Sequence, residues 1–90
     1  MKSKFKELCE FINSYEIGQP VKRKEITLRF SDSRGSIDTY RRMLSVAMYL
    51  SEGEGDGKYI LLRKIPEIFT TTKLCAEIYS IQSAKNFKII

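Results

Sequence analysis

Residues 36–50 (SIDTYRRMLSVAMYL) and 57–62 (GKYILL) carry the strongest secondary-structure signals in the chain. In the first stretch Ser36 is a good N-cap, and apolar residues follow at helical spacing. At about 100° per residue, one face of this helix collects Ile37, Tyr40, Leu44, Ala47 and Met48. The opposite face is polar: Arg42 stands at its centre, beside Asp38, Thr39 and Val46. The spacing predicts a helix over 36–50 that buries one side and presents a cation on the other.

The second stretch follows a segment that no helix tolerates. Residues 52–57 read EGEGDG, with three glycines in five positions, and then 58–63 turn apolar and aromatic-led, which is typical of a strand. With residues 49–51 as the antiparallel mate, the acidic glycine segment is the turn of a hairpin. A phosphate-binding loop would open a helix, and a calcium loop would need an acid where Arg63 stands, so neither interpretation fits.

Working outward, the remaining elements are short. Ser3 caps a first helix that Gly18 and Pro20 end by about residue 18; residues 20–21 are extended, residues 23–30 form a second helix, and residues 31–35 form a turn. A threonine at 70–72 caps a last helix through about Ser83. The expected core comprises Phe5, Leu8, Cys9, Ile12, Ile26, Phe30, Ile37, Tyr40, Leu44, Ala47, Leu50 and Leu62.

Composition narrows the function classes. The chain has 90 residues, 42% of them hydrophobic and 30% charged, which indicates one folded domain over 1–90. It has no histidine, and its two cysteines, Cys9 and Cys75, both read as small buried hydrophobes. We therefore expect no catalytic residue, metal or cofactor, and no small-molecule ligand. The longest uncharged run, 43–51, is far shorter than the ~20 residues of a membrane span, so we expect a cytoplasmic protein with no membrane partner, associated with the nucleoid if it binds DNA.

The net charge of +5 is concentrated in the middle of the chain. Residues 22–42 hold seven basic side chains against three acidic ones, whereas residues 51–57 hold three acids and no base. A basic segment of this kind is the electrostatic signature of a protein that binds a polyanion, although a solvated basic surface would look the same.

The order of elements (helix, short strand, helix, turn, helix, hairpin, helix) resembles the winged helix-turn-helix superfamily. The residues that carry the resemblance are 19–21 (QPV), 24–26 (KEI), 33–44 (SRGSIDTYRRML), 44–50 (LSVAMYL) and 57–62 (GKYILL), within about residues 4–65. The resemblance implies a mostly α form of the α/β class: a three-helix core with a β-hairpin wing, followed here by a C-terminal helix at about 71–83. Two positions depart from the superfamily pattern, because Met48 stands where glycine is common and the wing tip is acidic rather than basic.

The resemblance and the local chemistry together predict a protein that binds double-stranded DNA sequence-specifically. We expect a small transcriptional regulator that reads the major groove with helix 36–50. Arginine side chains can donate hydrogen bonds to guanine in the major groove. Hydroxyl groups near the start of a helix can donate to phosphate oxygens, and the basic residues that begin the second helix can contact the DNA backbone. The predicted DNA-binding residues are Lys22, Arg23, Lys24, Ser33, Arg34, Ser36, Thr39, Arg41, Arg42, Lys58 and Arg63. The acidic tip and Asp38 leave open an alternative, a winged-helix module that binds a protein, such as an accessory or phage-type factor.

The last helix carries more apolar surface than a small core needs. A homodimer through Leu74, Ile78 and Ile81 would double the DNA contacts and set the half-site spacing, while the simpler interpretation is that these residues cover the core of their own chain.

Overall fold

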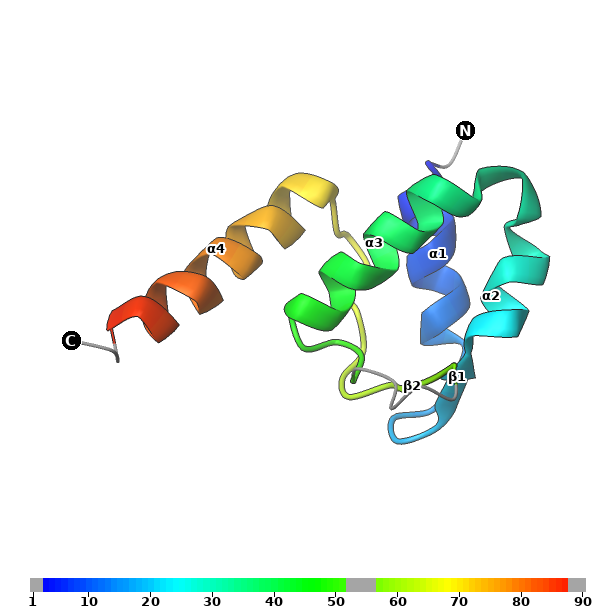
Figure 1. Ribbon diagram of the computed structural model, residues 1–90, viewed down its shortest axis with the longest axis horizontal. Helices are drawn as coiled ribbons and strands as arrows, with labels where there is room; N and C mark the ends of the chain where they lie inside the picture. Colours follow the sequence, from blue (N-terminus) through cyan, green and yellow to red (C-terminus); the bar gives the residue numbers. More distant parts are fainter. Residues whose placement is uncertain (1–2, 52–56, 88–90) are drawn as a thin grey trace.

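The structure, a computed structural model, describes residues 3–51 and 57–87, with side chains described through residue 84. Along the chain it contains α1 (Lys4–Asn13), β1 (Pro20–Lys22), α2 (Arg23–Arg29), the 3₁₀ turn η1 (Ser31–Ser33), α3 (Arg34–Val46), β2 (Lys58–Ile60) and α4 (Thr71–Phe87). The fold is mostly helical, as predicted, with a small antiparallel sheet. The two strands of this sheet are β1 and β2, whereas the predicted mate at 49–51 contributes only an isolated bridge. Helices α1, α2 and α3 gather around one centre, and α4 projects away from them (Figure 1).

Helix α1 begins as predicted and ends earlier than predicted. The Ser3 hydroxyl accepts a hydrogen bond from the Lys6 backbone N–H at 3.1 Å, which satisfies one free donor of the first turn. The helix stops at Asn13 rather than near residue 18. The Asn13 amide donates to the Ile65 carbonyl at 2.8 Å and accepts from the Ile65 N–H at 2.9 Å, so a contact 52 residues away holds the chain at this end.

The short sheet joins segments that are far apart in sequence. β1 pairs with β2 in the register Pro20↔Ile60, Val21↔Tyr59 and Lys22↔Lys58. The mate expected for the hairpin is also present, because Leu50 forms an antiparallel bridge to Leu61 and the Leu62 N–H donates to the Tyr49 carbonyl at 2.9 Å. The predicted hairpin turn at 52–56 lies outside the described residues.

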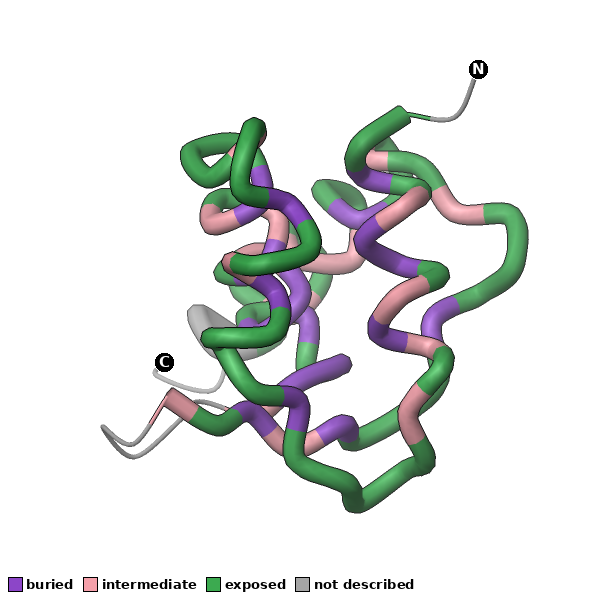
Figure 2. The backbone as a smooth tube through the Cα atoms, turned by 90° about the vertical axis from the view of Figure 1, so that its right-hand side faces the viewer, coloured by how far each residue is buried: buried purple, intermediate pink, exposed green. Residues whose placement is uncertain are grey.

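The core lies where α1, α3 and the paired segments meet (Figure 2). Ten of the twelve expected core residues are buried, whereas Tyr40 is half-buried and Leu62 is 44% exposed. Side chains alternate across an extended segment, so Tyr59 and Leu61 face inward and Leu62 faces out. The core also includes Tyr49, which is 1% exposed and which the apolar spacing did not predict.

Helix α3 is shifted relative to the prediction. It begins at Arg34 directly after η1, so Ser36 lies in its first turn and is exposed rather than capping it. It ends at Val46, because Met48 adopts a φ of 68° and turns the chain toward the sheet. Met48 is therefore 59% exposed rather than buried.

Helix α4 runs to Phe87, beyond the predicted end at Ser83, and the Thr70 hydroxyl accepts from the Lys73 N–H at its start. Leu74 is fully buried in the core of its own chain, and Ile78 is half-buried against that core. Leu74 is thus not available to a second copy, contrary to the predicted dimer contact. Cys75 is exposed rather than buried, whereas Cys9 is buried as predicted. Among the described residues no helix has the length and apolar character to cross a membrane.

Candidate nucleic-acid interface

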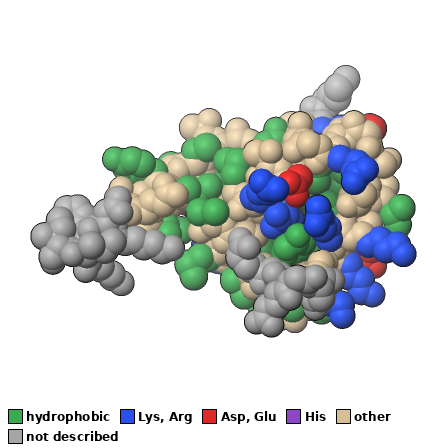
Figure 3. Space-filling view, viewed as in Figure 1, with side chains coloured by type: hydrophobic (Ala, Val, Ile, Leu, Met, Phe, Trp, Pro, Cys, Tyr) green, Lys and Arg blue, Asp and Glu red, His purple; other side chains and the backbone are tan. Residues whose placement is uncertain are grey.

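A basic groove lies where β1, the start of α2, the start of α3 and β2 come together. Its basic lining residues are Lys22, Arg23, Lys24, Arg34 and Lys58, and the remaining lining residues are Thr27, Leu28 and Gly57. Figure 3 shows basic side chains collected over α2, the neighbouring strands and α3, with few acidic side chains among them. Five of the eleven predicted DNA-binding residues are therefore brought together in one place.

Backbone geometry at Gly57 positions this groove. The Arg23 N–H donates to the Gly57 carbonyl at 2.7 Å, which ties the first turn of α2 to the start of β2. Gly57 has a φ of 74°, which side chains disfavour, and a Cβ at this position would lie 3.8 Å from the Arg23 Cβ. The sheet register places Lys22 directly opposite Lys58. Like charges in this position repel each other, so the register concentrates positive potential at the groove.

The outer face of α3 presents Arg42, as predicted. Its side chain is 71% exposed, and its guanidinium forms an ion pair with Asp38 at 3.1 Å, one helical turn earlier. The Thr39 hydroxyl donates to the Gly35 carbonyl at 3.1 Å and is thus engaged within the helix. Ser36 is exposed in the first turn of α3, and Ser33 is half-buried just before it.

Arg41 is placed in the interior instead of on the surface. It is only 9% exposed, and its guanidinium carbon lies 4.4 Å from the centre of the Tyr59 ring, a cation–π contact. Its Nη1 is 3.4 Å from the Ser45 hydroxyl and its Nη2 is 3.7 Å from an Asp38 carboxylate oxygen. Because the side chain is enclosed, Arg41 does not belong to the exposed basic surface.

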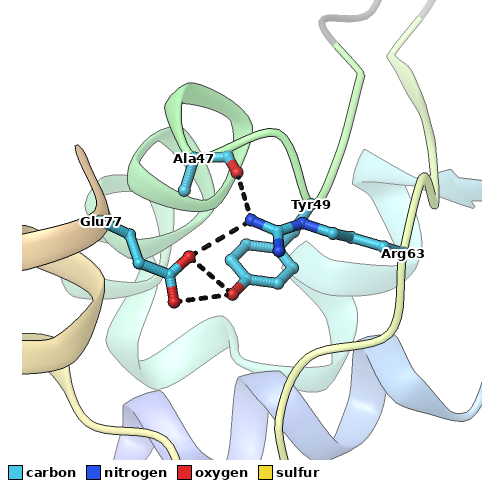
Figure 4. Close-up of polar contacts among 4 residues, drawn as sticks. All are labelled: Ala47, Tyr49, Arg63 and Glu77. Atoms are coloured by element: carbon cyan, nitrogen blue, oxygen red, sulfur yellow. Dashed lines mark hydrogen bonds and ion pairs between the residues drawn. The ribbon is translucent and has the colours of Figure 1, made fainter. Parts of the chain in front are cut away.

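Arg63 is engaged at the base of α4 (Figure 4). Its Nη2 donates to the Ala47 carbonyl at 2.9 Å and pairs with Glu77 at 3.2 Å, and its guanidinium lies 3.8 Å from the Tyr49 ring centre. The Tyr49 hydroxyl donates to the same carboxylate. Burial, together with this hydrogen bond, raises the pKa of Tyr49 to about 12, so the phenol stays protonated at neutral pH. Arg63 therefore holds α4 against the rest of the protein, and its guanidinium is occupied by these contacts rather than presented to a ligand.

A second cavity of about 250 Å³ lies behind the groove, between α2 and α3. Its polar lining consists of Arg23, Thr27, Arg34, Asp38 and Arg41, and Ile26, Phe30, Gly35 and Ile37 complete it. Arg23, Thr27 and Arg34 line both the groove and this cavity.

Sequence reasoning missed two groove residues, Thr27 and Leu28. Leu28 is 70% exposed, and the available signal was its position in α2, off the face defined by Ile26 and Phe30. An exposed leucine in a basic groove offers apolar contact to a ligand that also carries negative charge.

Within the described part of the chain, no group of three or more Cys, Asp or Glu side chains is arranged to hold a metal ion. Comparison of the chain with family models, curated proteins and solved structures found no match.

Proposed function

We propose that this protein binds double-stranded DNA, with the basic groove on the phosphate backbone and α3 directed at the major groove. The observation that carries the proposal is the convergence of Lys22, Arg23, Lys24 and Arg34 from two helices and a strand. None of these four side chains is paired with a carboxylate of the described residues, although ion pairs occur elsewhere on the surface. A cluster of cations of which these four have no carboxylate partner in the described part of the chain favours a polyanionic partner, because binding releases the counterions that such a partner carries.

Arg42 supplies the base-reading element of the proposal. Its exposed guanidinium can donate two hydrogen bonds to a guanine edge, and Asp38 holds it in a defined orientation on α3. Contacts of this kind distinguish one sequence from another, whereas the lysines of the groove contact phosphates that every sequence shares. The proposed role is a small transcriptional regulator.

A protein-interaction module is the second candidate. The observation in its favour is an exposed apolar pair at the end of α3, Val46 and Met48, which are 43% and 59% exposed. Among the cations gathered over this face in Figure 3, the groove lysines Lys22, Lys24 and Lys58 favour DNA over this alternative, because a protein-binding surface is usually depleted of lysine.

The test is fluorescence anisotropy of a labelled duplex titrated with the protein at several salt concentrations. If the groove contacts phosphates, log K falls linearly with log[salt], by about 0.9 per contact. Lys24→Ala combined with Arg34→Ala should weaken binding to all duplexes and flatten this slope. The matched control is Lys6→Ala combined with Lys73→Ala, which removes the same charge from exposed positions on α1 and α4. Equal losses in the two double variants would show that net charge, and not the groove, drives binding; no duplex binding at low salt would favour the protein-interaction module.

The base-reading step has its own comparison. Arg42→Ala should cost about 1–3 kcal/mol on a preferred sequence and relax the preference, while Lys24→Ala should weaken preferred and random duplexes equally. A selection from random duplexes with the unaltered protein and with Arg42→Ala measures both effects. An unchanged preference in Arg42→Ala would remove Arg42 from the reading role.

A further inference from the structure

The cavity between α2 and α3 contains a buried cation whose hydrogen-bonding capacity is largely unused. A guanidinium has five N–H donors. For Arg41 the structure provides one long hydrogen bond, at 3.4 Å to Ser45, and one ion pair, at 3.7 Å to Asp38, which is too long for a hydrogen bond. The Tyr59 ring lies 4.4 Å from the guanidinium carbon and partly compensates the charge, but such a cation–π contact uses none of the N–H donors. The Arg41 Nε is buried and has no hydrogen-bond partner among the described residues.

An arrangement of this kind is costly unless something else occupies the cavity. A charged donor that is buried without a partner loses its hydrogen bonds to water, and no protein hydrogen bond replaces them. The resulting free-energy cost is larger than for a neutral group. Asp38 compensates only in part, because its carboxylate also pairs with Arg42 at 3.1 Å. Polar groups left unsatisfied in this way commonly mark the place of a water or an ion.

The other cavity residues identify the charge that would fit. Arg23 and Arg34 line the same cavity as Arg41, so its lining contains three arginines and one aspartate. Arg34 and Gly35, which also line it, belong to the first turn of α3. A helix start carries partial positive charge and free N–H groups, which favour an anion. Arginine suits phosphate in particular, because its planar donors match the spacing of phosphate oxygens.

We propose that the α2–α3 cavity binds a phosphate group, with Arg41 as its buried anchor and Arg23 and Arg34 at its entrance. The volume of about 250 Å³ holds a phosphate together with a small organic group, and the walls formed by Ile26, Phe30 and Ile37 suit the apolar part of such a group. The phosphate could belong to a small free ester or to the DNA backbone, because both present the same oxygens. This site does not depend on the proposed DNA binding, and it revises the expectation that the chain has no small-molecule ligand.

The experiment follows the arginine Nε–H signals of the ¹⁵N-labelled full chain by NMR. Inorganic phosphate and phenyl phosphate are added separately against sodium chloride of equal ionic strength, and a duplex is added in a third series. Arg41→Lys, which keeps the charge and removes the Nε donor, assigns the signal. We expect the Arg41 signal to move saturably with phosphate, and phenyl phosphate to bind more tightly than inorganic phosphate because of the apolar walls.

Two variants test the binding itself. Arg34→Ala, at an exposed position, should lower the affinity for phenyl phosphate by about tenfold, the effect of losing one charge-assisted contact. Lys73→Ala, which removes an exposed cation that neither lines the cavity nor pairs with Asp38, should leave the affinity within about twofold. The two affinities also serve as a check if Arg41 variants fold poorly, since neither of these residues is buried.

The three series separate the sources. Movement of the Arg41 signal with the small phosphates assigns a free ester, whether or not the protein binds DNA. Movement with duplex alone assigns a backbone phosphate. An Arg41 signal that responds to none of the three, or that moves with chloride as much as with phosphate, overturns the proposal and leaves the DNA-binding proposal untouched.

Discussion

The Tyr49 hydroxyl donates to both carboxylate oxygens of Glu77, at 2.8 and 3.0 Å, and so joins the segment after α3 to the middle of α4. Arg63 completes this connection, stacking on the Tyr49 ring and pairing with the same carboxylate (Figure 4). Apart from Leu74 and the partly buried side chains near it, the described side chains of α4, through residue 84, have little apolar contact with the body. These polar contacts therefore add to the buried Leu74 side chain in holding α4 against the body.

Tyr49→Phe should lower the free energy of unfolding by about 1.5–3 kcal/mol, because it removes a hydrogen bond to a charged group while keeping the buried ring. Urea denaturation measures the change. Tyr79→Phe is the matched control: Tyr79 is 73% exposed on the same helix and should change stability by less than about 0.5 kcal/mol. Equal effects of the two substitutions would contradict the assigned role of the Tyr49–Glu77 contact.

Met48→Gly should stabilise the protein. Met48 adopts a φ of 68°, which costs a side-chain-bearing residue about 1–2 kcal/mol, and it is 59% exposed, so little burial is lost. Glycine adds flexibility to the unfolded chain, which leaves an expected gain of about 0.5–1 kcal/mol. Thermal unfolding of Met48→Gly beside Met48→Ala makes the comparison, since alanine retains the strain. A Met48→Gly protein less stable than Met48→Ala would contradict the backbone assignment.

Leu74→Ala should destabilise the chain by about 2–5 kcal/mol, because Leu74 is fully buried and its truncation leaves a cavity in the core. Ile68→Ala, at a position 79% exposed, should have an effect below about 0.5 kcal/mol. Sedimentation of the unaltered protein tests the predicted dimer separately. Of the three residues predicted to form the dimer contact, only Ile78 and Ile81 are partly exposed. If Leu74→Ala changed the oligomeric state and left the stability of the monomer intact, Leu74 would belong to an interface.

Alkaline pH should destabilise the protein. Burial, with a smaller contribution from Glu10, raises the pKa of Cys9 from 9.0 to about 12, and burial with the Glu77 hydrogen bond raises that of Tyr49 from 10.0 to about 12. Above pH 9.0 for Cys9, and above pH 10.0 for Tyr49, the folded state therefore holds a proton that the unfolded chain has lost. Stability thus falls as pH rises toward 12, by up to about 1.4 kcal/mol per pH unit for each group. Below pH 9 these groups contribute no slope. Urea denaturation from pH 7 to 11 should show the fall, and Cys9→Ala should reduce it; a flat profile would refute the assignment.

Local sequence patterns were enough to predict the features that depend on neighbouring residues. The Ser3 cap of α1, the exposed Arg42–Asp38 pair and the threonine cap of α4 all follow from interactions within one turn of a helix. The pairing of residues 49–51 with the 58–63 segment belongs to the same class, because a glycine-rich stretch joins the two arms directly. The start of α2 at Arg23 was also predicted, but Lys22 makes no side-chain cap there and the Arg23 N–H donates to the distant Gly57 carbonyl.

Which side chains lie between elements distant in sequence depends on long-range packing and could not be predicted from the sequence. Helical spacing locates an apolar arc, but α3 packs among several neighbours, so its buried side also includes Arg41 and Ser45, which the apolar pattern alone could not indicate. Likewise, whether Leu61 or Leu62 faces inward depends on the register with β1. Arg63, which was predicted to contact DNA, instead pairs with Glu77, fourteen residues further along the chain. The convergence of Lys22, Arg34 and Lys58 in one groove has the same origin, since long-range packing, and not local propensity, brings β1, α3 and β2 together.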